Sequence, residues 1–143
     1  MLKSATSPNP TADPCVHTFT YSLLPHLGDW RTAATPEMAY MLNIPVLAVP
    51  GQGGKGELAS FASVDAENVM IESVKHELHG ERTIIRLYEC YGARTEVTLK
   101  LGKAPKALKL ATMMEDELET VKTDGDSYTF EIKPYEIVTF IVE

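Results

Sequence analysis

The stretch HTFTYSLLPHLGDWR, residues 17–31, brings together side chains that could do chemistry. His26, Asp29 and Arg31 together could form a general acid–base cluster, and the neighbouring Trp30 could stack on a sugar ring. The same side chains also suit a polar corner that satisfies backbone groups where a strand ends, and we favour this interpretation. We therefore expect no catalytic residue here. His26, Asp29, Trp30 and Arg31 remain candidates for sugar contact.

Two other segments carry residues of the kinds that bind metals or act on sugars. His76 and His79 lie in HELH, one residue short of the HExxH spacing that places two zinc ligands on one helix face. This segment lies between two β-like runs and ends at Gly80, so we interpret it as a solvated turn without metal. The acidic run at residues 115–119 is interpreted as a solvated face, because glycoside chemistry needs two carboxyl groups opposed across a sugar.

Composition limits the classes of function. The chain has 143 residues, about one domain, and a formal net charge of −7, which argues against nucleic acid or an anionic membrane as a partner. No apolar run is long enough to span a bilayer, and the first 15 residues lack the apolar core of a signal peptide. Cys15 and Cys90 have no CxxC partner, so we expect reduced thiols in a cytoplasmic protein.

The first third of the chain mixes several kinds of segment. Residues 1–14, rich in Ser, Thr, Pro and Asn, predict a disordered arm or connector. Residues 15–24 alternate as a strand does, up to Pro25. Thr35 and Pro36 then predict a short helix that ends before Pro45. The segment GQGGKGE, residues 51–57, has the composition of a flexible linker.

Residues 58–143 have a strongly β pattern. Alternating apolar runs are separated by turn signals that contain Gly, Pro, Asp or Asn, and no helical pattern lies between the runs. This arrangement predicts an all-β fold, an antiparallel β-sandwich. Asp124-Gly125 suits a tight hairpin turn. The last run, with Ile137 and Phe140, is the most apolar, so we expect it to be a central strand.

Several segments resemble glycoside hydrolase family 38 α-mannosidases of the cytosolic and bacterial type. HTFTYSLLPHLGDWR is similar to a signature stretch near the C-terminal end of that family. Residues 57–101 resemble its NVvl…iilRlyE…G pattern, MMEDELE resembles its NLLEE patch, and FEIKPYEIVTFIVE resembles its closing segment. The resemblance runs from about residue 16 to the end, with the motifs in order. No catalytic motif of the family, such as its early His-x-Asp pair, maps onto this sequence.

The resemblance implies a division of the chain and a role for it. Residues 15–50 would be the end of the family's central β-domain, a strand and a helix, and residues 58–143 its C-terminal sandwich. The enzymes of the family are retaining exo-α-mannosidases. Their aspartate nucleophile and their zinc or other divalent metal would belong to a catalytic domain missing from this chain, so no cofactor is expected here. The expected partners are the catalytic and central β-domains, and we also expect a homo-oligomer. The polar cluster at residues 26–31 would then make an interdomain contact.

Two other functions stay open. A carbohydrate-binding module would use exposed aromatic side chains, of which Trp30 is the best placed because it follows a strand end; aromatic side chains within strands are more often core. A small independent enzyme would use His26, Asp29 and Arg31, but it would also need a cleft and a further group to work with them.

Overall fold

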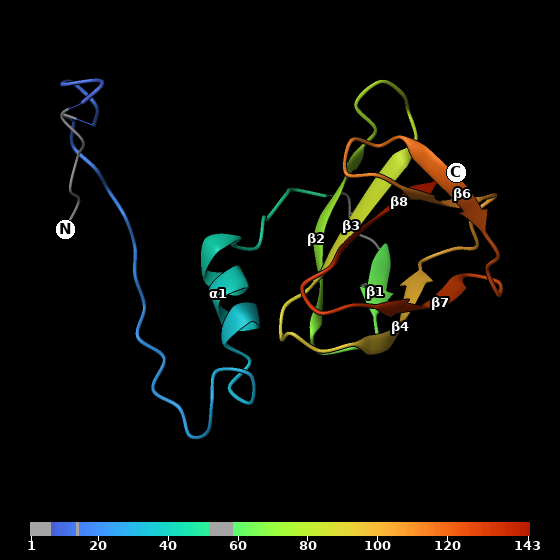
Figure 1. Cartoon of the computed structure of the whole chain (residues 1–143), viewed down its shortest axis with the longest axis horizontal. Helices are drawn as coiled ribbons and strands as arrows, with labels where there is room; N and C mark the ends of the chain where they lie inside the picture. The colour runs from blue at the N-terminus through green and yellow to red at the C-terminus, as the bar shows by residue number, and fades with distance from the viewer. Residues whose placement is uncertain (1–6, 14, 52–58) are drawn as a thin grey trace. The chain divides into compact units, whose positions relative to one another are not determined.

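A computed structural model describes residues 7–13, 15–51 and 59–143 of the chain (Figure 1). The chain divides into two compact units, Met1–Thr35 and Pro36–Glu143. Most of the predicted linker at residues 51–57, and half of the predicted arm at residues 1–14, lie outside the described ranges. The domain boundary proposed at the linker therefore stays a prediction.

The helix α1 (Thr35–Asn43) begins and ends where the sequence predicts. Pro36 lies in the first turn, where its missing N–H costs no hydrogen bond. The amide of Ile44 donates to the carbonyl of Tyr40 at 2.8 Å, and Pro45 prevents a further turn. The hydroxyl of Tyr40 donates to the carbonyl of Glu72 at 3.0 Å, which ties the helix to the first long strand of the sandwich.

The strand predicted for residues 15–24 is wrong for this chain. Residues 16–26 have no strand pairing in the structure, and Phe19, Tyr21 and Leu23 are 67%, 78% and 84% exposed. The alternation of side chains is present, but a strand also needs a neighbour for its backbone N–H and C=O groups. No described strand pairs with this segment.

The predicted antiparallel sandwich is confirmed. One sheet has the order β1 (Ala62–Val64), β4 (Thr95–Leu101), β7 (Ser127–Ile132). The other has the order β2 (Val69–His76), β3 (Thr83–Glu89), β8 (Ile137–Val142), β5 (Leu108–Ala111), β6 (Glu117–Val121). The final strand β8 lies between β3 and β5, with Ile85 opposite Phe140. The prediction that this most apolar run is central is confirmed.

The core lies between the two sheets, because inward-facing side chains alternate along each strand. Fully buried members of this core include Ile85, Leu87, Val97, Leu99, Leu108, Ile132 and Phe140. Three aromatic rings gather within it: Phe140 meets Phe130 and Tyr128 edge to face, at centroid distances of 5.3 and 5.8 Å. Edge-to-face contact is a favourable geometry for aromatic pairs.

The turn at Asp124-Gly125 differs from the predicted hairpin. The amides and carbonyls of Asp124 and Ser127 exchange hydrogen bonds of 2.8 and 3.0 Å, and Gly125 has φ +60°, so a tight turn does form. However, the turn joins β6 of one sheet to β7 of the other. It carries the chain across the sandwich, and the two strands it connects do not pair.

A second apolar cluster lies on the outer face of the five-stranded sheet. Ile84, Ala111 and Ile141 are buried there, away from the main core. The loop between β5 and β6, residues 112–116, is held to the strands β2 and β3. Nη2 of Arg86 donates to the carbonyl of Met113 at 2.9 Å, and the carboxylate of Glu115 accepts from the amide of Leu78 at 2.7 Å.

Candidate functional site

Asp29 organises the turn that precedes α1. Its Oδ1 accepts hydrogen bonds of 3.0 Å from the amides of Arg31 and Thr32, and the hydroxyl of Thr32 donates back to the carbonyl of Asp29 at 3.0 Å. The amide of Thr32 is the main cause that holds the pKa of Asp29 below its ordinary value. Asp29 is therefore kept as an anion by backbone donors, which suits a turn-forming role.

The other candidates in this segment lie around the same turn. The guanidinium of Arg31 lies over the ring of Trp30, 4.3 Å from its centroid, and 3.8 Å from a carboxylate oxygen of Asp29. Nδ1 of His26 lies 2.8 Å from the carbonyl of Leu24. The structure thus brings Asp29, Trp30 and Arg31 together. Arg31 covers one face of the Trp30 indole, the ring on which a sugar would stack.

The two histidines of HELH lie where the sequence analysis placed them, around a turn. His76 is the last residue of β2, and His79 lies in the turn before β3. Within residues 7–13, 15–51 and 59–143, no group of three or more His, Cys, Asp or Glu side chains is arranged to hold a metal ion. None of the helices in these ranges is long and apolar enough to cross a membrane.

The most enclosed polar site of the sandwich is built on Glu89, which the sequence analysis missed. Glu89 ends β3 on its inward-facing row, after Ile85 and Leu87, and is 1% exposed. Its Oε1 accepts hydrogen bonds of 2.8 Å from the side-chain amide of Asn68 and the backbone amide of Tyr91. The alternation of β3 was the available signal, since it places this carboxylate on the core face.

Oε2 of Glu89 binds the turn of Tyr91 a second time and joins one further turn to the same carboxylate. It accepts from the amide of Gly92 at 2.8 Å and from the amide of Tyr135 at 2.9 Å. Burial alone would raise the pKa of Glu89, but the donors, led by the amide of Tyr135, outweigh it and lower the pKa to about 2. Glu89 is therefore a charged structural hub at this end of the sandwich, with its acceptor positions filled.

The amide of Tyr135 bonds to Glu89 from a backbone conformation that is unusual for a non-glycine residue, with φ +58°. Its ring lies over Gly92, where an added Cβ would come within 2.5 Å of the Tyr135 hydroxyl. Gly92 itself has φ +76°. The hydrogen bonds to Glu89 therefore hold Tyr135 in a backbone conformation unfavourable for a non-glycine residue, whereas Gly92 adopts its positive φ without strain.

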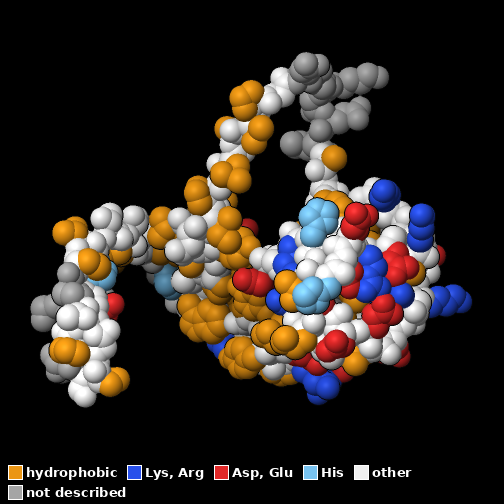
Figure 2. Space-filling model, turned by 90° about the horizontal axis from the view of Figure 1, so that it is seen from above, with side chains coloured by type: hydrophobic (Ala, Val, Ile, Leu, Met, Phe, Trp, Pro, Cys, Tyr) orange, Lys and Arg blue, Asp and Glu red, His pale blue; other side chains and the backbone are white. Residues whose placement is uncertain are grey.

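A network of ion pairs covers part of the outer face of the five-stranded sheet. Arg82 contacts Glu77, Glu117 and Glu143, and Nζ of Lys109 lies 3.1 Å from Glu117 and 2.8 Å from Glu143. Hydrogen bonds from Arg82 hold the pKa of Glu77 and of Glu117 below the ordinary value. Side chains of both signs are interleaved on the face of the sandwich seen in Figure 2. Because each of these carboxylates is paired with a cation, the ion pairs suit a structural role better than acid–base catalysis.

Comparison with known proteins identifies the sandwich. The model of the glycosyl hydrolases family 38 C-terminal beta sandwich domain matches residues 68–140, from just before β2 into β8. The chain is 34% identical to Alpha-mannosidase 2C1 of Mus musculus over 119 residues, which are 80% of this chain and 12% of that protein. It is 34% identical to Alpha-mannosidase 2C1 of Homo sapiens, over 80% of this chain and 11% of that protein.

A third relative gives a longer match. Alpha-mannosidase G of Dictyostelium discoideum is 30% identical over 154 residues, covering 98% of this chain and 14% of that protein. The chain thus spans only a small fraction of the length of these relatives. From the family model and the identities together, the chain belongs to glycoside hydrolase family 38 and contains its C-terminal β-sandwich domain.

Proposed function

We propose that this chain is the non-catalytic C-terminal portion of a retaining, metal-dependent exo-α-mannosidase that degrades mannose-containing glycans in the cytoplasm. The observation that carries the proposal is the family match, which extends through the strands β2 to β8. The α-mannosidase names of the relatives, which are far longer than this chain, support a glycosidase as the whole protein.

The chemistry of the whole enzyme would lie in the preceding domains. A retaining glycosidase needs one carboxylate as nucleophile and another group for proton transfer, placed about 5–5.5 Å apart across the sugar. In the described residues the strongly held carboxylates, Glu89 and those around Arg82, are occupied by donors. The described side chains also offer no cluster that fits zinc. We therefore assign the nucleophile and the metal ligands to the preceding part of the enzyme.

The role proposed for this chain is structural support. A sandwich with a filled core and turns fixed by a buried carboxylate is a rigid body, suited to buttress the catalytic and central β-domains. Side chains that would meet those domains include the exposed apolar residues outside the core. On the sandwich these include Leu78, Met113, Met114, Leu118, Tyr135 and Ile137.

A chimaera tests the proposal. The part of mouse Alpha-mannosidase 2C1 that matches this chain is replaced by the matching residues of this chain, and the matching part is deleted in a second variant. We expect the chimaera to be soluble and to keep α-mannosidase activity, whereas the deletion should be insoluble or inactive. A deletion variant as active and as stable as the intact mouse enzyme would contradict the structural role.

A further inference from the structure

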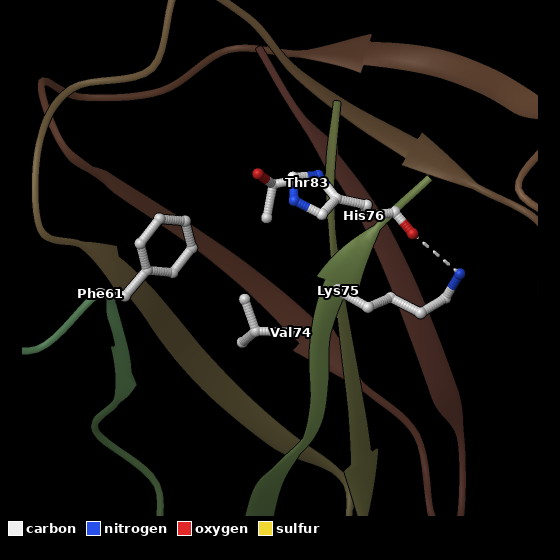
Figure 3. A pocket seen from close by; sticks show the side chains of 5 residues that line it. All are labelled: Phe61, Val74, Lys75, His76 and Thr83. Carbon is white, nitrogen blue, oxygen red and sulfur yellow. Dashed lines mark hydrogen bonds between the residues drawn. The ribbon is translucent and has the colours of Figure 1, made fainter. Parts of the chain in front are cut away.

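The sandwich has an apolar hollow at its open side, between β1 and β2. The hollow has a volume of about 210 Å³ and is lined by Phe61, Val74, Lys75, His76 and Thr83. Figure 3 shows Phe61 and Val74 facing it, while the Lys75 side chain points away and donates to the carbonyl of His76 at 3.1 Å. Phe61 and Val74 are 50% and 47% exposed, although Val74 lies opposite Ile85, in the inward-facing row of the sheet.

The three-stranded sheet also ends beside this hollow in an edge strand. β1 has three residues, lies at the edge of the three-stranded sheet and pairs only with β4 among the described strands. The outer backbone groups of β1 therefore pair with no described strand, although the carbonyl of Ala62 accepts a hydrogen bond of 2.8 Å from the hydroxyl of Ser60. In the five-stranded sheet, β2 has eight residues, against the three of β1. One added strand beside β1 would cover the exposed faces of Phe61 and Val74.

A segment of the same chain has the properties of that missing strand. Residues 46–49, Val-Leu-Ala-Val, form an apolar run with no strand partner in the described structure, and Val46, Leu47 and Val49 are 97%, 87% and 81% exposed. Apolar side chains line the chain between α1 and the grey residues in Figure 2. Such an exposed apolar run would ordinarily be buried against another apolar surface.

The length and the flanks of this segment match β1. Pro45 and Pro50 bound it, and a proline cannot donate to a sheet ladder, so pairing is confined to four residues and to an edge position. The sequence between Pro50 and Phe61 has four glycines within residues 51–56 and, at about 3.3 Å per residue, spans roughly 30 Å when extended. The chain can therefore turn back and lay residues 46–49 against β1.

We infer that residues 46–49 dock beside β1 as a fourth strand of the smaller sheet and close the hollow. Since side chains alternate along a strand, Leu47 and Val49 would face Phe61 and Val74, whereas Val46 and Ala48 would face outward. The occupant of the hollow is thus a segment of this chain. The inference concerns the sandwich alone and holds whether or not the proposed function is correct.

Hydrogen exchange of the intact chain tests the docking. We expect the alternate amides of residues 46–49 that point to β1 to exchange at least tenfold more slowly than in an unstructured chain of the same sequence, because only these would donate to β1. The double variant Leu47→Ser, Val49→Ser should lose this protection, while the matched control Val46→Ser should keep it. Exchange of residues 46–49 at unstructured rates in the unsubstituted chain would overturn the inference, as would an equal loss in the control.

A cysteine pair identifies the occupant. In a chain with Cys15→Ser and Cys90→Ser, a disulfide between Leu47→Cys and Val74→Cys should form within one molecule, with several-fold higher yield than the control pair Val46→Cys and Val74→Cys. A disulfide between two molecules would show that a second copy fills the hollow and would overturn the intramolecular form. Equal yields for the two pairs would overturn the docking register. If the cysteine-free chain does not fold, the exchange experiment decides the question.

Discussion

The side-chain amide of Asn68 lies 2.8 Å from Oε1 of Glu89, and it also donates to the hydroxyl of Thr95 at 2.8 Å. The turn before β2, the end of β3 and the start of β4 are joined by this one amide. Because Glu89 also accepts from the amides of Tyr91, Gly92 and Tyr135, three turns depend on one buried charge: the turns before β2, after β3 and before β8. A buried carboxylate with this many donors stabilises the fold only while it stays ionised.

Glu89→Gln should lower the free energy of unfolding by about 3 kcal/mol at pH 7, because the amide leaves buried donors without acceptors. The pKa of Glu89 is depressed to about 2 in the folded state, so its contribution is present above the unfolded pKa near 4.5 and is lost as the pH falls toward 2. Urea unfolding between pH 7 and pH 2.5 measures this. The variant should show a shallower loss of stability between pH 4.5 and 2.5 than the unsubstituted chain. A Glu81→Gln control at the exposed turn should match the unsubstituted chain; equal pH profiles for Glu89→Gln would contradict the hub.

Phe140→Ala should lower the free energy of unfolding by about 3–5 kcal/mol. Phe140 is 1% exposed, lies in the central strand β8 and packs against Tyr128 and Phe130, so its loss leaves a cavity in the aromatic cluster. Leu118→Ala, at a side chain 60% exposed on the edge strand β6, is the control and should change stability by less than about 0.5 kcal/mol. Similar losses for both variants in chemical denaturation would show that β8 is not at the centre of the core.

Titration with mannose oligosaccharides should leave the fluorescence of Trp30 unchanged. Trp30 is 38% exposed, and the Arg31 guanidinium lies 4.3 Å from the ring centroid, so it covers one face of the indole. Because Trp30 is the only tryptophan in the sequence, the signal reports on this site alone. A saturable change that Trp30→Phe abolishes would favour the alternative function, a carbohydrate-binding module.

The isolated chain should associate with itself. Residues 16–24 carry the side-chain alternation of a strand and expose Phe19, Tyr21 and Leu23, so they can pair with another chain by their free backbone groups. Light scattering at high protein concentration should give a mass above that of one chain. Tyr21→Pro should reduce the association, because it removes a backbone donor, whereas Tyr21→Thr should not. A strict monomer at all concentrations would contradict this prediction.

The sequence predicted those elements whose own pattern specifies them. The strands β2, β3, β4 and β7 show the alternation that places one face on the core, and β8 is the most apolar run, with Val138 to Ile141 all buried. For α1, the Thr35-Pro36 start and the Pro45 stop sufficed. The acidic strand β6 was missed because four of its five residues are exposed and no alternation marks it; pairing with β5 makes it a strand.

The remaining errors share one physical cause, which is dependence on a distant partner. Residues 15–24 have a strand pattern without a neighbouring strand, and pattern alone does not supply the hydrogen-bonded partner. The turn at Asp124-Gly125 was predicted correctly as a turn, but the pairing of its flanking strands is decided by which sheet each strand joins. Glu89 could have been found as a carboxylate on the core face of β3, yet its donors come from turns 2 to 46 residues away.

The central claim is that this chain is the non-catalytic part of the enzyme. The most direct test is to assay the purified chain with an aryl α-mannoside, with and without added zinc or cobalt. The proposed role predicts no turnover above the blank under any of these conditions, while the mouse chimaera, assayed alongside, does hydrolyse the substrate. Metal-dependent hydrolysis that co-purifies with the folded chain, and that persists after contaminating mannosidase is removed, would contradict the claim that this sandwich is non-catalytic.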